Sequence, residues 1–106
     1  MKYYFCQLGG VIYAEDELRQ ILIRMSSDLH ISVNKYISNE NNKDMFIPIQ
    51  QGDYVLMSNC PYYNSMHIKC HDLAQNQIVD KYSQLYPTGT KITMYDYQMN
   101  KIEWVV

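Results

Sequence analysis

The chain has 106 residues, of which 19% are charged, and a formal net charge of −2 at pH 7. This composition excludes both the highly charged, weakly apolar pattern of disordered chains and the strongly basic surface of polyanion-binding proteins. A chain of this length forms one domain that can fold without disulfides or metal. We therefore expect a single domain over residues 1–106, and we disfavour direct nucleic-acid binding.

The cysteines and the apolar runs bear on the compartment. Cys6, Cys60 and Cys70 are odd in number and lack the dense spacing of a disulfide framework, so free thiols in a reducing compartment are expected. The first ten residues hold no apolar run of signal-peptide length, and no stretch approaches the ~18 apolar residues of a membrane span. These patterns predict a cytoplasmic protein that is neither exported nor inserted in a membrane.

The first third of the chain predicts a hairpin followed by a helix. Residues 3–7 and 11–13 are short, aromatic and β-branched, and Gly9 and Gly10 between them can adopt the positive φ angles of a tight turn. Over residues 14–29 the apolar residues then follow the helical period, and three acidic residues crowd the first turn, where they favour the positive end of the helix dipole. The apolar stripe of this helix comprises Leu18, Ile21, Leu22, Met25 and Leu29.

A second short helix is expected over residues 31–37, with Ser32 as its cap. Two helices that meet at a tight turn suggest a helix-turn-helix, but His30 stands where that motif usually has Gly, and Lys35 is the only cation in the candidate recognition segment. A DNA-binding role for this pair is therefore disfavoured.

The middle of the chain predicts a further hairpin and a strand. Residues 45–49 and 54–58 are apolar runs joined by a turn at Gly52 and Asp53, and Pro48 suits an edge strand because it lacks an N–H. Residues 65–71 alternate polar and apolar side chains, which is the period of a strand.

The last third predicts a helix and two strands. Asp72 has the character of an N-cap, with Gln75 three residues later, and an apolar stripe then runs to the end of a helix over residues 73–86. Strands follow over residues 90–97 and 101–106. The expected fold is α+β, with a mostly antiparallel sheet of short hairpins and two main helices, residues 14–29 and 73–86, packed on one face.

One group of residues could hold a metal ion. Zinc binds Cys and His side chains, and four such residues lie within twelve positions: Cys60, His67, Cys70 and His71. A helix would bring His67 and His71 together, whereas a strand sends them roughly 13 Å apart, with Cys70 on the other face. The strand period favours the second arrangement, so we expect neither zinc nor another cofactor, and we expect no catalytic pair of Cys70 and His71.

The tyrosines carry the strongest functional hint. The chain has 11 Tyr and only 2 Phe, although both are large aromatic residues. A phenol combines rigid contact area with a polar tip, so it suits a surface that is wet alone and buried in a complex. Tyr62 and Tyr63 follow Pro61 in a polar loop, and Tyr95 and Tyr97 alternate on a predicted strand. The competing interpretation is that tyrosines line the edges of a thin core.

These signals favour a non-enzymatic protein-protein interaction module that binds through Tyr62, Tyr63, Tyr95 and Tyr97. Small size and codon-like bias suggest an inhibitor or adaptor, encoded by a phage or mobile element, that acts on a bacterial host or defence protein. The first alternative is a small-ligand or nucleotide-binding protein in which tyrosines stack on a ring. The second is a zinc-dependent function through the Cys/His group, and homo-oligomers are compatible with either case.

Overall fold

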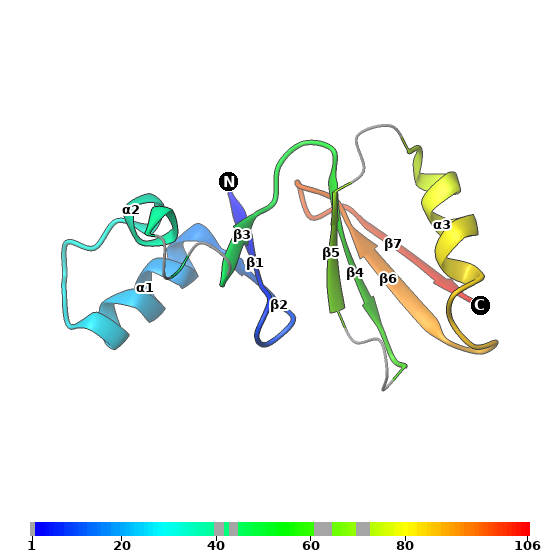
Figure 1. The fold of residues 1–106 in the computed structure, drawn as a ribbon, viewed down its shortest axis with the longest axis horizontal. Helices are drawn as coiled ribbons and strands as arrows, with labels where there is room; N and C mark the ends of the chain where they lie inside the picture. The colour runs from blue at the N-terminus through cyan, green and yellow to red at the C-terminus, as the bar shows by residue number, and fades with distance from the viewer. Residues whose placement is uncertain (1, 40–41, 43–44, 61–64, 70–72) are drawn as a thin grey trace. The chain divides into compact units, whose positions relative to one another are not determined.

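The computed structural model describes residues 2–39, 42, 45–60, 65–69 and 73–106. The chain folds into two compact units, Met1–Ile49 (unit 1) and Gln50–Val106 (unit 2), each with its own antiparallel sheet (Figure 1). The α+β class is confirmed, but the strands are shared between two sheets rather than one. The chain was expected to form one domain over residues 1–106, and this expectation stays a prediction, since a compact unit is not in itself a domain.

Unit 1 contains the predicted opening hairpin. Strand β1 (Tyr3–Cys6) pairs antiparallel with β2 (Val11–Ala14), and Gly10, with φ of 64°, closes the turn by donating its N–H to the carbonyl of Cys6 at 2.8 Å. A third strand, β3 (Phe46–Pro48), pairs with the other edge of β1. The order β2-β1-β3 leaves Pro48 on an edge strand, as its missing N–H predicts.

The pairing predicted for β3 was wrong. Residues 45–49 do not form a hairpin with residues 54–58, because β3 pairs with β1 and the following strand, β4 (Asp53–Ser58), belongs to the second sheet. The turn at Gly52 does form, with φ of 93°. Phe46 is buried in the cluster of unit 1, so packing of this side chain with Tyr4 decides which strand β3 joins.

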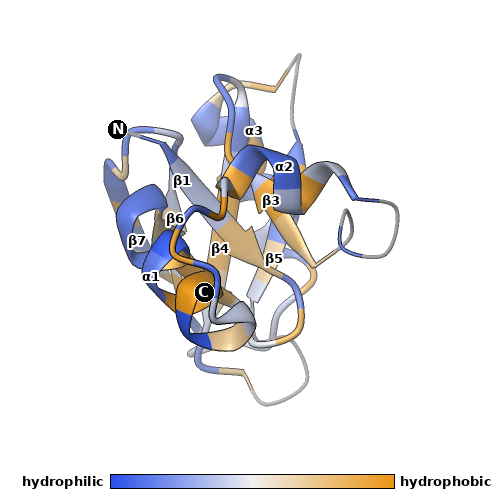
Figure 2. Ribbon diagram, turned by 90° about the vertical axis from the view of Figure 1, so that its left-hand side faces the viewer, coloured by the Kyte–Doolittle hydropathy of each residue, from blue (hydrophilic) through white to orange (hydrophobic). Residues whose placement is uncertain are grey.

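Two helices complete unit 1. Helix α1 (Glu15–Ser26) ends three residues before the predicted end at Leu29, and α2 (Val33–Ser38) follows it. The chain leaves α1 at Ser27, which adopts φ of 58°, while the hydroxyl of Ser26 donates to the Leu22 carbonyl at 2.7 Å. Such local side-chain bonds compete with helix propagation. Helix α1 contains both hydrophilic and hydrophobic residues, as the colouring in Figure 2 shows.

The core of unit 1 lies between its helices and its sheet. Its buried members are Tyr4, Leu18, Leu22, Val33 and Phe46. The rings of Tyr13 and Tyr36 flank Phe46, with centroids 6.4 and 6.3 Å away, so aromatic packing closes the edge of this core.

Unit 2 is a four-stranded antiparallel sheet with one helix. Besides β4 it contains β5 (Ser65–Lys69), β6 (Lys91–Tyr95) and β7 (Lys101–Val105), in the order β5-β4-β6-β7. The strand predicted from alternation at residues 65–71 is present as far as Lys69, and β6 pairs with β7 as predicted.

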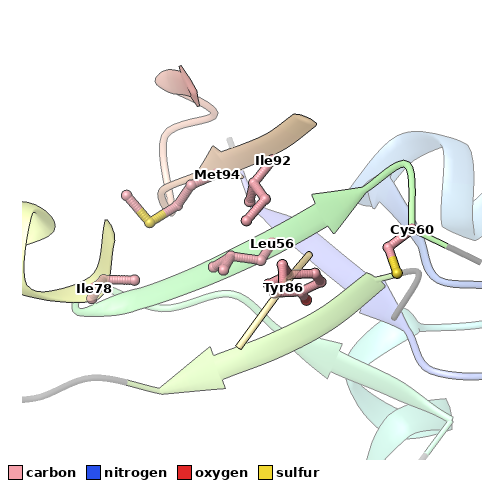
Figure 3. Close-up of a cluster of buried hydrophobic side chains, with 6 residues drawn as sticks. All are labelled: Leu56, Cys60, Ile78, Tyr86, Ile92 and Met94. Atoms are coloured by element: carbon pink, nitrogen blue, oxygen red, sulfur yellow. The ribbon is translucent and has the colours of Figure 1, made fainter. Parts of the chain in front are cut away.

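Helix α3 (Gln75–Ser83) of unit 2 is shorter than the predicted residues 73–86. Its N-cap is Ala74, whose N–H donates to Oε1 of Gln77 at 2.8 Å, whereas Asp72, the predicted cap, lies outside the described residues. Ile78 of α3 and Tyr86 join strand residues in a buried cluster (Figure 3). The cluster comprises Leu56, Cys60, Ile78, Tyr86, Ile92 and Met94.

The two main helices therefore cover different sheets, since α1 contributes to the cluster of unit 1 and α3 to that of unit 2. We expected both main helices to pack on one face of a single sheet. This expectation is corrected, because β2-β1-β3 and β5-β4-β6-β7 form two separate hydrogen-bonded sheets. In the described part of the chain, no helix has both the length and the apolar composition needed to cross a membrane.

Candidate functional site

The tyrosines of the described residues sit at the margins of the two cores. Tyr4 and Tyr86 are buried. The others are half-buried, and none in the described part of the chain is fully exposed. For these residues the structure supports the interpretation of Tyr as a core-edge residue. The half-buried set comprises Tyr3, Tyr13, Tyr36, Tyr54, Tyr82, Tyr95 and Tyr97.

Tyr62 and Tyr63 lie outside the described residues, but the chain on both sides of them is firmly held. Asn59 donates its N–H to the Lys91 carbonyl at 3.2 Å, and its side-chain Oδ1 accepts the N–H of Lys91 at 2.9 Å. Cys60 is 6% exposed within the core cluster, and Ser65 pairs with Met57 in the β4–β5 ladder. The segment of residues 61–64 therefore starts and ends at fixed points of one sheet.

Tyr95 and Tyr97 belong to the β6–β7 connection at the far end of the same sheet. The register pairs Tyr95 with Val55 and Lys101, whereas Ser58, next to Asn59, pairs with Ile92. Asp96 holds this connection, because its carboxylate accepts the N–H groups of Gln98 and Asn100 at 2.9 and 2.8 Å. About 13 Å of strand, at roughly 3.3 Å per residue, separates Tyr95 from Lys91, the residue to which Asn59 is hydrogen-bonded.

The structure does not bring the candidate zinc ligands Cys60 and His67 together. Cys60 packs in the cluster with Leu56, whereas His67 pairs across the ladder with Val55, on the opposite face from Leu56. Cys70 and His71 lie outside the described residues. In the part of the chain that is described, no three His, Cys, Asp or Glu side chains gather in a metal-binding arrangement.

His67 instead faces a carboxylate that the sequence did not single out. Its Nε2 lies 3.3 Å from Oδ2 of Asp53, and the two side chains are only 10% and 2% exposed. The same Oδ2 accepts the N–H of Gln50 at 2.9 Å, which closes the turn before β4. Asp53 Oδ1 is buried without a hydrogen bond among the described residues. This pair joins the start of β4 to β5. From the sequence, Asp53 was predicted only as part of a turn.

Unit 1 contains a hollow that no pattern in the sequence predicted. Its volume is about 250 Å³, and it lies beside α2, between the connection that precedes this helix and the residues that follow it. The connection before α2 lines the hollow with Asp28, His30, Ile31 and Ser32. Helix α2 contributes Lys35 and Tyr36, and the residues after the helix contribute Asn39 and Asn42. Residues 40–44 adjoin it in sequence, and most of them lie outside the described part.

Comparisons of the chain with protein-family models, with curated proteins and with solved structures find no match. The site must therefore be argued from its own residues. Two features are candidates for recognition: the stretch of sequence with Tyr62 and Tyr63, which lies outside the described residues, and the hollow beside α2.

Proposed function

We propose that the protein is a non-enzymatic protein-binding module that recognises its partner chiefly through Tyr62 and Tyr63. The observation that carries the proposal is the anchoring of the chain at Asn59, Cys60 and Ser65. Two adjacent aromatic residues lie only a few residues from these fixed points. A short segment held at both ends loses less conformational entropy on binding than a free one.

The nature of the side chains supports the same proposal. Every tyrosine in the described part of the chain is at least half-buried, so those residues offer little aromatic area to a partner. Tyr62 and Tyr63 follow a proline and precede Asn64, a composition typical of recognition loops. Tyr95 and Tyr97, half-buried at the far end of the sheet, would add contacts at the rim of a larger interface.

The proposed biological role is that of a small inhibitor or adaptor, encoded by a phage or mobile element, that acts on a bacterial host or defence protein. The size of 106 residues and the bias of the composition towards Ile, Asn, Lys and Tyr support this part of the proposal. A partner protein from a bacterial lysate is accordingly the ligand to seek.

The test is capture of a partner by the tagged protein, with bound proteins identified by mass spectrometry. Tyr62→Ala with Tyr63→Ala is compared with a matched double variant, Tyr95→Ala with Tyr97→Ala. A stoichiometric partner should be held by the wild type, lost by the first variant and largely kept by the second. Retention by the first variant, or a partner that only the second variant loses, would remove residues 61–64 from the proposal.

A further inference from the structure

We infer that the hollow beside α2 is a binding site for a small zwitterion of the free amino-acid class. It lies in unit 1, whereas Tyr62 and Tyr63 belong to unit 2, so the inference stands or falls independently of the proposed protein-binding function.

The size of the hollow limits the ligand to a small molecule. A volume of about 250 Å³ corresponds to roughly eight water molecules, at about 30 Å³ each in the liquid. It lies just below the usual range of pockets that hold drug-sized ligands, which begins at ~300 Å³. A peptide or a dinucleotide is too large to enter it, whereas a free amino acid fits.

The walls of the hollow are fixed by contacts within unit 1. The Tyr36 ring packs against Phe46, and its N–H donates to the Ser32 carbonyl at 2.9 Å. On the other side, Asp28 Oδ1 accepts the N–H of His30 at 2.9 Å, which holds the carboxylate in place. Asn42 donates its N–H to the Asn39 carbonyl at 2.9 Å. These contacts hold Asp28, Tyr36 and Asn42 in the positions that line the hollow.

The charges around the hollow have both signs. Asp28 supplies a carboxylate and Lys35 an ammonium group, and no ion pair of either lies within the described residues. A simple anion would be repelled by Asp28, and a simple cation by Lys35. A zwitterion satisfies both, with its ammonium group at Asp28 and its carboxylate at Lys35.

The neutral groups suit the rest of such a ligand. Ser32 occupies the N-cap position of α2, but its hydroxyl makes no capping hydrogen bond and is available to the ligand. Ile31 offers an apolar surface for an aliphatic group, and the Tyr36 ring offers a face for the ligand ammonium or for a second ring. The set therefore recognises a small molecule that has two opposite charges and a modest side chain.

The inference is tested with the full chain and the twenty common free amino acids, by following backbone amide resonances. A ligand this small in an open site should bind with a Kd of roughly 1 mM, so the panel is tested to about 10 mM. At least one amino acid should shift resonances of residues 28–42 in a saturable way. If no member of the panel does so, the inference is wrong.

Two variants then test the charges. Asp28→Asn keeps an oxygen that can accept the His30 N–H and removes only the charge, and Lys35→Met removes the other charge from an exposed position. Each should weaken binding about fivefold or more. Asp80→Asn and Lys2→Met make the same changes at exposed positions that do not line the hollow and should leave the Kd unchanged.

The decarboxylated amine and the deaminated acid of the amino acid that binds provide the last comparison. Both should bind more weakly than the zwitterion, because each leaves one charged side chain unmatched. The Asp28→Asn variant should bind the acid more tightly than the wild type does, because the repulsion from the carboxylate is gone. Equal binding of either analogue and the zwitterion by the wild type, or no gain in binding of the acid by the Asp28→Asn variant, would contradict the assignment of a zwitterion.

Discussion

Unit 1 and unit 2 build their cores from different parts of the chain. In unit 1, most of the buried cluster comes from helices, through Leu18, Leu22 and Val33. In unit 2, strands supply three of the six buried residues described in the cluster, Leu56, Ile92 and Met94, and the helix supplies only Ile78. The strands follow the same division, since those of unit 1 have three or four residues and those of unit 2 have five or six. Helices therefore supply a larger share of the buried cluster in unit 1 than in unit 2, whereas both units contain paired strands.

The largest effect is expected from opening a cavity in either core. Leu22→Ala in unit 1 and Leu56→Ala in unit 2 each truncate a side chain with 0% exposure. Each should lower the free energy of unfolding by about 2–5 kcal/mol. Because each cluster consists of residues from its own unit, amide hydrogen exchange should show the greater loss of protection in the unit that carries the change. Leu85→Ala, at an exposed position, is the control, and an equal loss in both units would contradict this division.

Unit 2 contains the nearly buried pair of Asp53 and His67, and breaking it is expected to have the next largest effect. Asp53→Ala removes the acceptor of the Gln50 N–H and the carboxylate that faces His67. The expected loss is about 2–4 kcal/mol in urea-induced unfolding, because the Gln50 N–H loses its acceptor and the nearly buried His67 loses the carboxylate that it faces. Asp53→Asn keeps an acceptor oxygen and should cost less. A loss below about 0.5 kcal/mol for Asp53→Ala would show that the pair contributes little.

One side-chain hydrogen bond joins the helix of unit 2 to its edge strand. Nε1 of Trp104 on β7 donates to Oγ of Ser83 at the end of α3, at 2.9 Å. Ser83→Ala should lower stability by about 0.5–1.5 kcal/mol. A double-mutant cycle with Trp104→Phe isolates the pair, since the double variant should cost less than the sum of the single ones. Additive losses would mean that the hydrogen bond does not couple the two elements.

The units should also differ at alkaline pH. Burial, and then the nearby negative charge of Glu15, raises the pKa of Tyr4 in unit 1 above its usual 10.0. A raised pKa means that the folded state holds the proton more firmly, so this stability is complete below pH 10 and is lost as the pH rises through the folded pKa. In equilibrium unfolding above pH 10, Tyr4→Phe should show a smaller decline than the wild type. Identical slopes for the two proteins would contradict this role of the phenol.

The smallest effect is expected in acid, from unit 2. The hydrogen bond from Lys91, and then the charges of Lys91 and Lys101, lower the pKa of Glu103 on the edge strand β7. The contribution of a carboxylate with a lowered pKa is present above its unfolded value and disappears as the pH falls through the folded pKa. Because Glu103 is exposed, the effect should be slight and should weaken in salt. Glu103→Gln should flatten this part of the stability profile, and a salt-independent change would contradict the assignment.

Local features of the fold were predictable from the sequence. The hairpin of β1 and β2 follows from short aromatic and β-branched runs on either side of Gly9 and Gly10, and β6 and β7 were also expected as strands. The end of α1 was placed too late, because the apolar period continues to Leu29 while bonds around Ser26 and Ser27 stop the helix. Periodicity reports which residues favour a helix, not where side chains compete with it.

Features that depend on distant residues could not be read in this way. The partner of β3 is β1, some 40 residues away in sequence, and no local signal distinguishes it from the neighbouring β4. Asp53 and His67 meet only because β4 and β5 adopt one register, and the hollow exists only because two connections flank α2. Of the candidate partner-binding residues, Tyr95 and Tyr97 are placed by the structure, whereas Tyr62 and Tyr63 rest on the sequence and on their anchored flanks.

The most direct test of the proposed function is the affinity of the captured partner for the wild type and for the Tyr62→Ala, Tyr63→Ala double variant, measured with the melting temperature of each. We predict a Kd raised about tenfold or more, because paired aromatic anchors commonly contribute over 1.4 kcal/mol to binding, and an unchanged melting temperature. An unchanged Kd with a lowered melting temperature would show that these tyrosines stabilise the fold and do not recognise a partner.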